Sequence, residues 1–153
     1  MISRILACLL LSLAAAACDG ATEPEGIEGL YEVATVNGDD PPEYINWNGS
    51  QEGGTQLTGA LLRIIPPDSI ALALVTRTVE DGDAGPKQTE VFRGTYQVEA
   101  GHITTSMLRS DTDRPLGFAA GAVLDGRIDL TVNMLAPAYT GYFSYPVSMS
   151  FRR

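Results

Sequence analysis

The sequence predicts an all-β fold, a single antiparallel up-and-down β-barrel of about eight strands, with a β-sandwich as the alternative. After residue 26, about eight or nine short apolar runs alternate with turn signals. Short connections favour antiparallel pairing of successive strands. No stretch of this region has the apolar period of about 3.6 residues that marks a helix. About eight such strands can close into a barrel, which removes exposed edges.

Turn signals set the limits of the predicted strands. Asn37-Gly38, followed by two acids and two prolines, ends the first strand, and Pro66-Pro67 ends a later one. Asp-Gly at 125–126, between two apolar runs, is a strong hairpin signal. The predicted strands cover residues 29–36, 44–47, 55–65, 69–80, 89–99, 103–109, 116–124, 127–135 and 142–151.

Alternation with a period of two residues separates the faces of several predicted strands. It is clearest in residues 69–80, where bulky residues share the face expected to point inward. Pro146 has no amide proton and therefore suits a sheet edge or a bulge. The alternating residues are Ile70, Leu72 and Leu74, then Phe92, Gly94, Tyr96 and Val98, then Phe143, Tyr145, Val147, Met149 and Phe151.

The first 18 residues have the pattern of a bacterial lipoprotein export signal. Arg4 precedes a mostly apolar run at 5–17, which is short of the roughly 20 residues that a spanning helix needs. The run AAAC at 15–18 resembles a lipobox, so residues 1–17 are expected to be removed and Cys18 lipidated. The alternative is an ordinary A-x-A signal peptidase site, which is cut at the same bond and leaves Cys18 free.

Removal of the signal also removes Cys8, so Cys18 becomes the only remaining cysteine. The fold is therefore expected to need no disulfide. Residues 18–26 are predicted to form a flexible tether and residues 27–153 the barrel domain. Two or more acyl chains anchor a protein stably. The expected location is the bacterial cell envelope, on the inner or the outer membrane, facing the periplasm or the exterior.

The charge balance is acidic, with 10 Lys and Arg against 19 Asp and Glu. Nucleic acids and anionic lipid surfaces attract basic proteins, so nucleic-acid binding and flat contact with a lipid surface are both disfavoured. Simple solubility of an exported domain explains the acidity.

Four short motifs are similar to those of the small lipocalin-like lipoproteins of bacteria: Gly29-Leu30-Tyr31, Val36-Asn37-Gly38, Gly94-Thr95-Tyr96 and Phe151-Arg152-Arg153. The resemblance implies a lipocalin-like barrel in which an arginine of the last strand packs across an aromatic ring of the first strand. Tyr31 stands where those proteins have tryptophan, and Arg152 or Arg153 would supply the guanidinium. The alternative is that Tyr31 is an ordinary core residue and both arginines are a solvated tail.

Catalytic and metal-binding motifs are not recognisable. His102 is the only histidine and follows a turn, and no serine has a G-x-S-x-G context. Residues 81–85 (DGDAG) resemble the start of a calcium loop, but the twelfth position is Phe92 instead of glutamate, so a polar hairpin loop is expected. The sequence predicts a protein that is not an enzyme and has no metal or cofactor.

Two functions remain open. The first is a membrane-tethered binding module that holds a small apolar ligand inside the barrel, with ligand-binding residues that the sequence does not identify. The second is a structural or protein-interaction accessory of the envelope with a solid barrel core, which contacts another envelope protein through loops such as 39–54 with Trp47. The interior volume of the barrel distinguishes the two.

Overall fold

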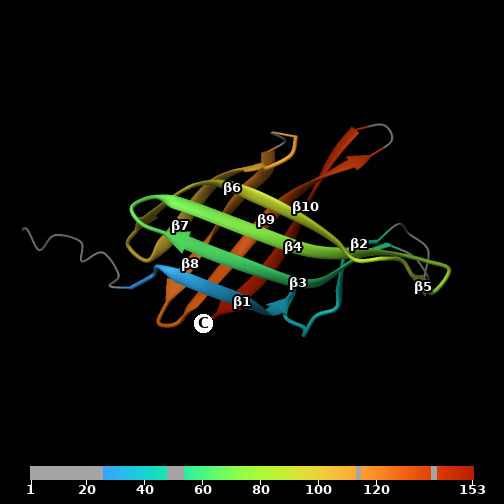
Figure 1. Ribbon diagram of the computed structural model, residues 1–153, viewed down its shortest axis with the longest axis horizontal. Helices are drawn as coiled ribbons and strands as arrows, with labels where there is room; N and C mark the ends of the chain where they lie inside the picture. The colour runs from blue at the N-terminus through green and yellow to red at the C-terminus, as the bar shows by residue number, and fades with distance from the viewer. Residues whose placement is uncertain (1–25, 48–53, 113–114, 139–140) are drawn as a thin grey trace, which may run out of the picture.

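Eight antiparallel strands form a closed barrel in the computed structural model, which describes residues 26–47, 54–112, 115–138 and 141–153 (Figure 1). Each strand pairs with the next barrel strand along the chain, and the last strand pairs back with the first. The predicted up-and-down barrel is therefore confirmed, in preference to the sandwich. The barrel strands are β1 (Gly29–Val36), β3 (Gly54–Ile65), β4 (Ser69–Glu80), β6 (Gln88–Glu99), β7 (His102–Arg109), β8 (Pro115–Leu124), β9 (Arg127–Ala138) and β10 (Gly141–Arg152).

Two short strands extend the sheet past the barrel wall. β2 (Glu43–Trp47) pairs with the first residues of β3, beyond the part of β3 that β1 occupies. β5 (Asp83–Ala84) pairs with the last residues of β4. β2 confirms the brief strand predicted at 44–47, whereas β5 falls within a segment that the sequence predicts as a loop.

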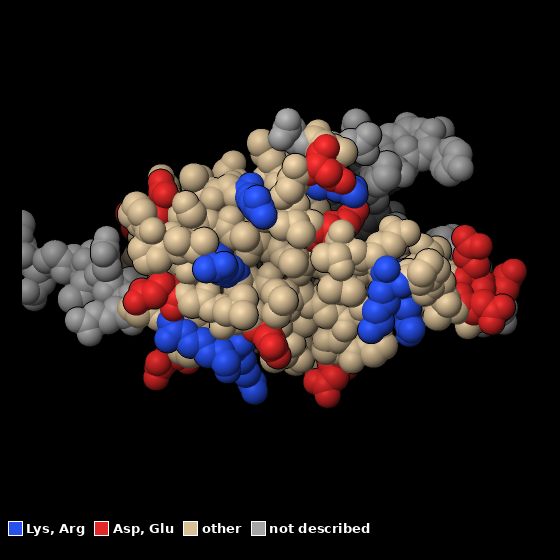
Figure 2. Space-filling view, viewed as in Figure 1, with Lys and Arg blue, Asp and Glu red and all other residues tan. Residues whose placement is uncertain are grey.

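The two ends of the barrel differ. The tether end, as we name it, holds Gly26, Arg153 and the short turns at 66–68, 100–101 and 125–126. The opposite loop end holds the longer connections and the extension made by β2 and β5. Figure 2 shows acidic side chains gathered at the tip of β4 and β5, where the exposed residues are Glu80, Asp81 and Asp83.

Alternation along the strands places the predicted residues as expected. Ile70, Leu72 and Leu74 are 0–2% exposed, while the alanines between them face outward. Phe92, Tyr96, Val147, Met149 and Phe151 are also buried, and Val98 is partly buried against the core. The side chains of Phe143 and Tyr145 lie outside the described residues.

Pro146 lies at an edge, as predicted. The last paired residues of β1 and β10 are Val36 and Met149. Asn37 then bonds both backbone groups of Ser148, through its own amide and its side-chain oxygen. Backbone groups two residues apart in a strand point the same way, so those of Pro146 point past the end of β1 and no amide proton is needed there.

Two inward-facing glycines let neighbouring strands approach closely. A Cβ atom at Gly94 would lie 1.8 Å from the carbonyl oxygen of Ser106 on β7. A Cβ atom at Gly121 would lie 1.7 Å from the carbonyl oxygen of Asp129 on β9. Glycine at such positions permits the sharp curvature that a small barrel needs.

Candidate functional site

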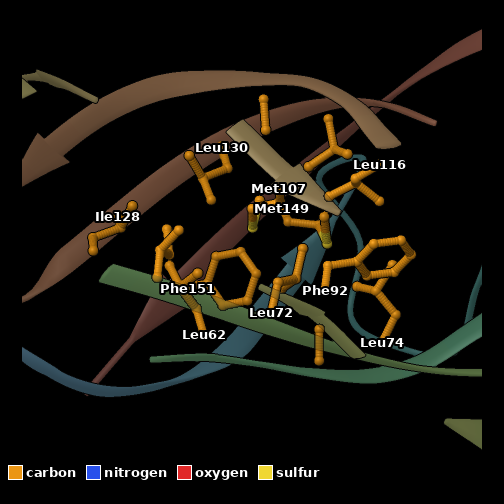
Figure 3. Close-up of a cluster of buried hydrophobic side chains, with 14 of the residues drawn as sticks. Leu62, Leu72, Leu74, Phe92, Met107, Leu116, Ile128, Leu130, Met149 and Phe151 are labelled. Atoms are coloured by element: carbon orange, nitrogen blue, oxygen red, sulfur yellow. The ribbon is translucent and has the colours of Figure 1, made fainter. Parts of the chain in front are cut away.

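The described interior of the barrel is filled by side chains. Inward residues from all eight barrel strands form one apolar cluster (Figure 3). Leu62, Leu72, Leu74 and Phe151 in that cluster are 0% exposed. A void large enough for water would leave exposed area on the side chains that line it, so no such void borders these residues. The interior around this cluster therefore has no room for a small apolar ligand.

Tyr31 closes the tether end of the core. Its side chain is buried, and its hydroxyl donates a hydrogen bond to the carbonyl oxygen of Ile27 at 2.8 Å. The guanidinium carbon of Arg153 lies 5.2 Å from the centre of the Tyr31 ring. Arg153 also donates to the carbonyl oxygens of Gly26 and Glu28. The predicted arginine-on-ring contact is thus present, and it ties the last residue of the chain to the first described ones.

Arg153 is the arginine that makes this contact. Arg152 belongs to the ladder of β10, where it is paired in register with Glu32 of β1 and Arg127 of β9. The alternative in which both arginines form a solvated tail is therefore wrong for Arg153.

Replacing Arg153 with alanine is expected to lower the free energy of unfolding by about 1 kcal/mol, because a partly exposed cation–π contact contributes about this amount. The matched control is Arg152→Ala, which should change stability by less than about 0.5 kcal/mol, as is usual for a surface substitution. Urea denaturation of both variants measures the difference. Equal losses would show that the ring contact contributes nothing.

An ion-pair cluster covers the core at the loop end. Arg109 lies 2.7 Å from Glu90 through Nη1 and 2.7 Å from Asp111 through Nε. Glu90 is opposite the buried Leu74, and Arg109 is opposite the buried Phe92, so both continue the inward faces of their strands. Their side chains are about one third exposed, and ion pairs at that exposure stabilise a fold little.

Sequence reasoning missed this cluster, although a signal for it exists. Glu90 stands two residues before Phe92, and Arg109 stands two residues after the buried Met107. Extending the two-residue period beyond the apolar positions would have placed both charges over the core.

Two depressions mark the outer surface. One, of about 790 Å³, lies over β7 to β10 and is lined by small residues such as Ala120 and Ala122 beside the Arg127–Asp129 ion pair. The other, of about 1070 Å³, lies at the tether end between Ile27, the 66–68 turn and residues 96–104.

The predicted site residues are not brought together. His102 is exposed at the start of β7, which confirms it as a surface residue, and Asp81-Gly82 forms a turn before β5, which confirms a polar hairpin loop. Within the described ranges, no group of three or more His, Cys, Asp and Glu residues is placed to hold a metal ion. Cys18, residues 48–53 and the Trp47 side chain lie outside the described residues.

The described segments contain no helix with the length and apolar character needed to cross a membrane. The fold defines the class of the protein as a small, closed, antiparallel β-barrel with an apolar interior. No family model, curated protein or solved structure matches the chain.

Proposed function

We propose that this protein is a non-enzymatic lipoprotein of the bacterial cell envelope, with a solid lipocalin-like barrel that works as an interaction accessory. The filled interior is the observation that carries this proposal. It favours the accessory over a module that holds an apolar ligand, because the inward side chains of all eight barrel strands contact one another at the centre.

The tether holds the barrel close to its membrane. Cys18 and Gly26 are eight residues apart, a span of at most about 29 Å when fully extended. A lipid on Cys18 therefore keeps the tether end near the bilayer, and the acidic loop end is the end of the barrel farthest from the lipid anchor. Loop-end residues are accordingly well placed to meet another envelope protein.

Replacing Cys18 with serine is expected to release the protein from the membrane fraction, because two or more acyl chains on that sulfur provide a stable anchor. Fractionation after a high-salt wash, with intact mass of the mature chain, measures both anchoring and lipidation. Cys8→Ser is the matched control and should leave the membrane-bound fraction unchanged. An unchanged fraction for Cys18→Ser would overturn the anchor.

The solid barrel has its own test. Native mass spectrometry of the Cys18→Ser chain should show the mass of the polypeptide alone. A small apolar molecule bound at a one-to-one ratio would contradict the filled interior and restore the ligand-binding function.

A further inference from the structure

One outer side of the barrel combines exposed apolar residues with two arginines. We name it the Leu–Arg face and define it by Leu30, Leu61, Arg63, Ile65, Arg93 and Leu108, on β1, β3, β6 and β7. The four apolar side chains are 41–56% exposed. Figure 2 shows basic side chains within a mostly uncharged surface on this side, with acidic side chains along its lower edge and at both ends.

The strand register aligns these residues in a row across the sheet. From β1 to β7, each residue of the row is opposite the next: Leu30, Arg63, Ala71, Arg93 and Leu108. The row crosses five strands and follows the curved barrel wall for about 19 Å, because neighbouring strands lie about 4.8 Å apart. Its ends, Leu30 on β1 and Leu108 on β7, are four barrel strands apart and lie at the curved margins of the face. Its centre, on β3, β4 and β6, carries both arginines beside the exposed side chains of Leu61 and Ile65.

The centre of this face, on β3, β4 and β6, is cationic although the whole chain is acidic. Among the described residues, no ion pair involves Arg63 or Arg93. Two exposed carboxylates lie at the β1 margin of the face: Glu32, which is opposite Leu61 and Arg152, and Glu28, which directly precedes the Gly29–Ile64 pair. The net charge of −9 thus hides a separation of charge between this face and the acidic loop end.

We infer that the Leu–Arg face lies flat on the surface of a bilayer that contains anionic phospholipids, the same bilayer that holds the lipid on Cys18. This inference rests on the tether of the proposed function. Guanidinium groups bind phosphate groups with paired hydrogen bonds, and exposed leucine and isoleucine side chains enter the boundary between headgroups and acyl chains.

The position of the tether favours this occupant. The tether ends at Gly26, four residues before Leu30. Ile65 lies at the same end of the barrel, because its neighbour Ile64 is paired with Gly29. A length of at most about 29 Å from Cys18 lets the face reach the headgroups.

Other arrangements fit the charges less well. Standing on the tether end would press the carboxylates of Asp68, Glu99 and Asp125, one in or beside each turn, against anionic headgroups. Pairing with a second copy of the chain would set the two arginines of each face against those of the other. Like charges in such contacts repel.

A single-cysteine label tests the face on the complete lipidated chain. Ala73→Cys places a fluorophore on β4 between Leu61 and Val91, within the Leu–Arg face. Thr131→Cys on the outside of β9, four barrel strands away in either direction, is the matched control position. The lipidated chain has no other free thiol, so the unsubstituted protein should take no label. Phosphatidylcholine vesicles with and without phosphatidylglycerol, doped with a nitroxide phospholipid, report contact by quenching.

Quenching is expected to be strong at position 73 and weak at position 131, and to require phosphatidylglycerol. Arg63→Gln combined with Arg93→Gln should shift the chain away from the flat orientation about 30-fold, because each basic residue contributes about fivefold at an anionic surface. Lys87→Gln combined with Arg127→Gln removes the same charge elsewhere and should leave the quenching at position 73 unchanged.

Each contrary result has a distinct meaning. Equal quenching at positions 73 and 131 would overturn the inference. A fluorescence change at position 73 that depends on protein concentration in the absence of lipid would also overturn it, and would indicate that the face binds a second copy of the chain. If the chain does not float with vesicles and Cys18 takes the label, Cys18 has a free thiol and carries no lipid. That result would overturn the lipid tether but not the inference about the face. In that case Cys18→Ser with Ala73→Cys, added from solution, decides the face: phosphatidylglycerol-dependent quenching supports it, and none overturns it.

Discussion

Replacing Gly121 with alanine is expected to lower the free energy of unfolding by more than about 3 kcal/mol, which exceeds the usual cost of overpacking a core. The new methyl group would lie 1.7 Å from the carbonyl oxygen of Asp129 and 2.9 Å from the Cα atom of Leu130. Both are backbone atoms of the adjacent strand β9, so no side-chain rotation relieves the overlap. Relief requires β8 and β9 to separate, which breaks the ladder that closes the barrel.

The matched control for this change is Gly59→Ala on β3. A Cβ atom at Gly59 has no neighbour within 4 Å, so alanine there should change stability by less than about 1 kcal/mol. Urea denaturation followed by circular dichroism compares the midpoints of the variants. Equal midpoints for Gly121→Ala and Gly59→Ala would show that β8 and β9 are not in such close contact.

Replacing Phe151 with alanine is expected to cost about 3–5 kcal/mol, the usual range for removing a large aromatic side chain from a core. Phe151 is 0% exposed on the last strand and belongs to the cluster that joins all eight barrel strands. A small domain is stable by about 5–15 kcal/mol in total, so this single change removes much of that margin. Leu124→Ala, at a leucine that is 43% exposed, is the control and should cost far less.

The same variant tests whether the barrel is solid. Phe151→Ala would leave a dry apolar cavity, and cavities of that kind bind small aromatic molecules such as benzene. Benzene should therefore raise the melting temperature of Phe151→Ala and leave that of the unsubstituted protein unchanged. A comparable rise for the unsubstituted protein would mean that a cavity already exists.

Much of the barrel could be predicted because its signals are local. The alternation of Ile70, Leu72 and Leu74 defines which face of β4 points inward, and Asp125-Gly126 defines a hairpin whose strands pair as expected. β5 was missed because two residues that pair with the end of β4 carry no period of their own. The sequence predicts either Arg152 or Arg153 as the partner of Tyr31. The structure places Arg152 in the ladder of β10 and Arg153 over the Tyr31 ring.

The remaining features depend on how distant strands meet. An eight-stranded barrel can be filled or can hold one small ligand, and only the combined volume of side chains from all strands decides which. The Leu–Arg face has the same origin, because Arg63 and Arg93 share a row through the registers of β3, β4 and β6. Total charge cannot report such a placement, and the labelling experiment on this face therefore tests the sequence-based argument against flat contact with lipid.

The contact between Arg153 and residues near Gly26 has a practical consequence for engineering. An even number of antiparallel barrel strands returns the chain to the end where it started, so a tag fused after Arg153 would lie beside Gly26 and displace the guanidinium from the Tyr31 ring. Reporter domains are better inserted between β2 and β3, at the opposite end, where they would leave the contact between Arg153 and Tyr31 undisturbed.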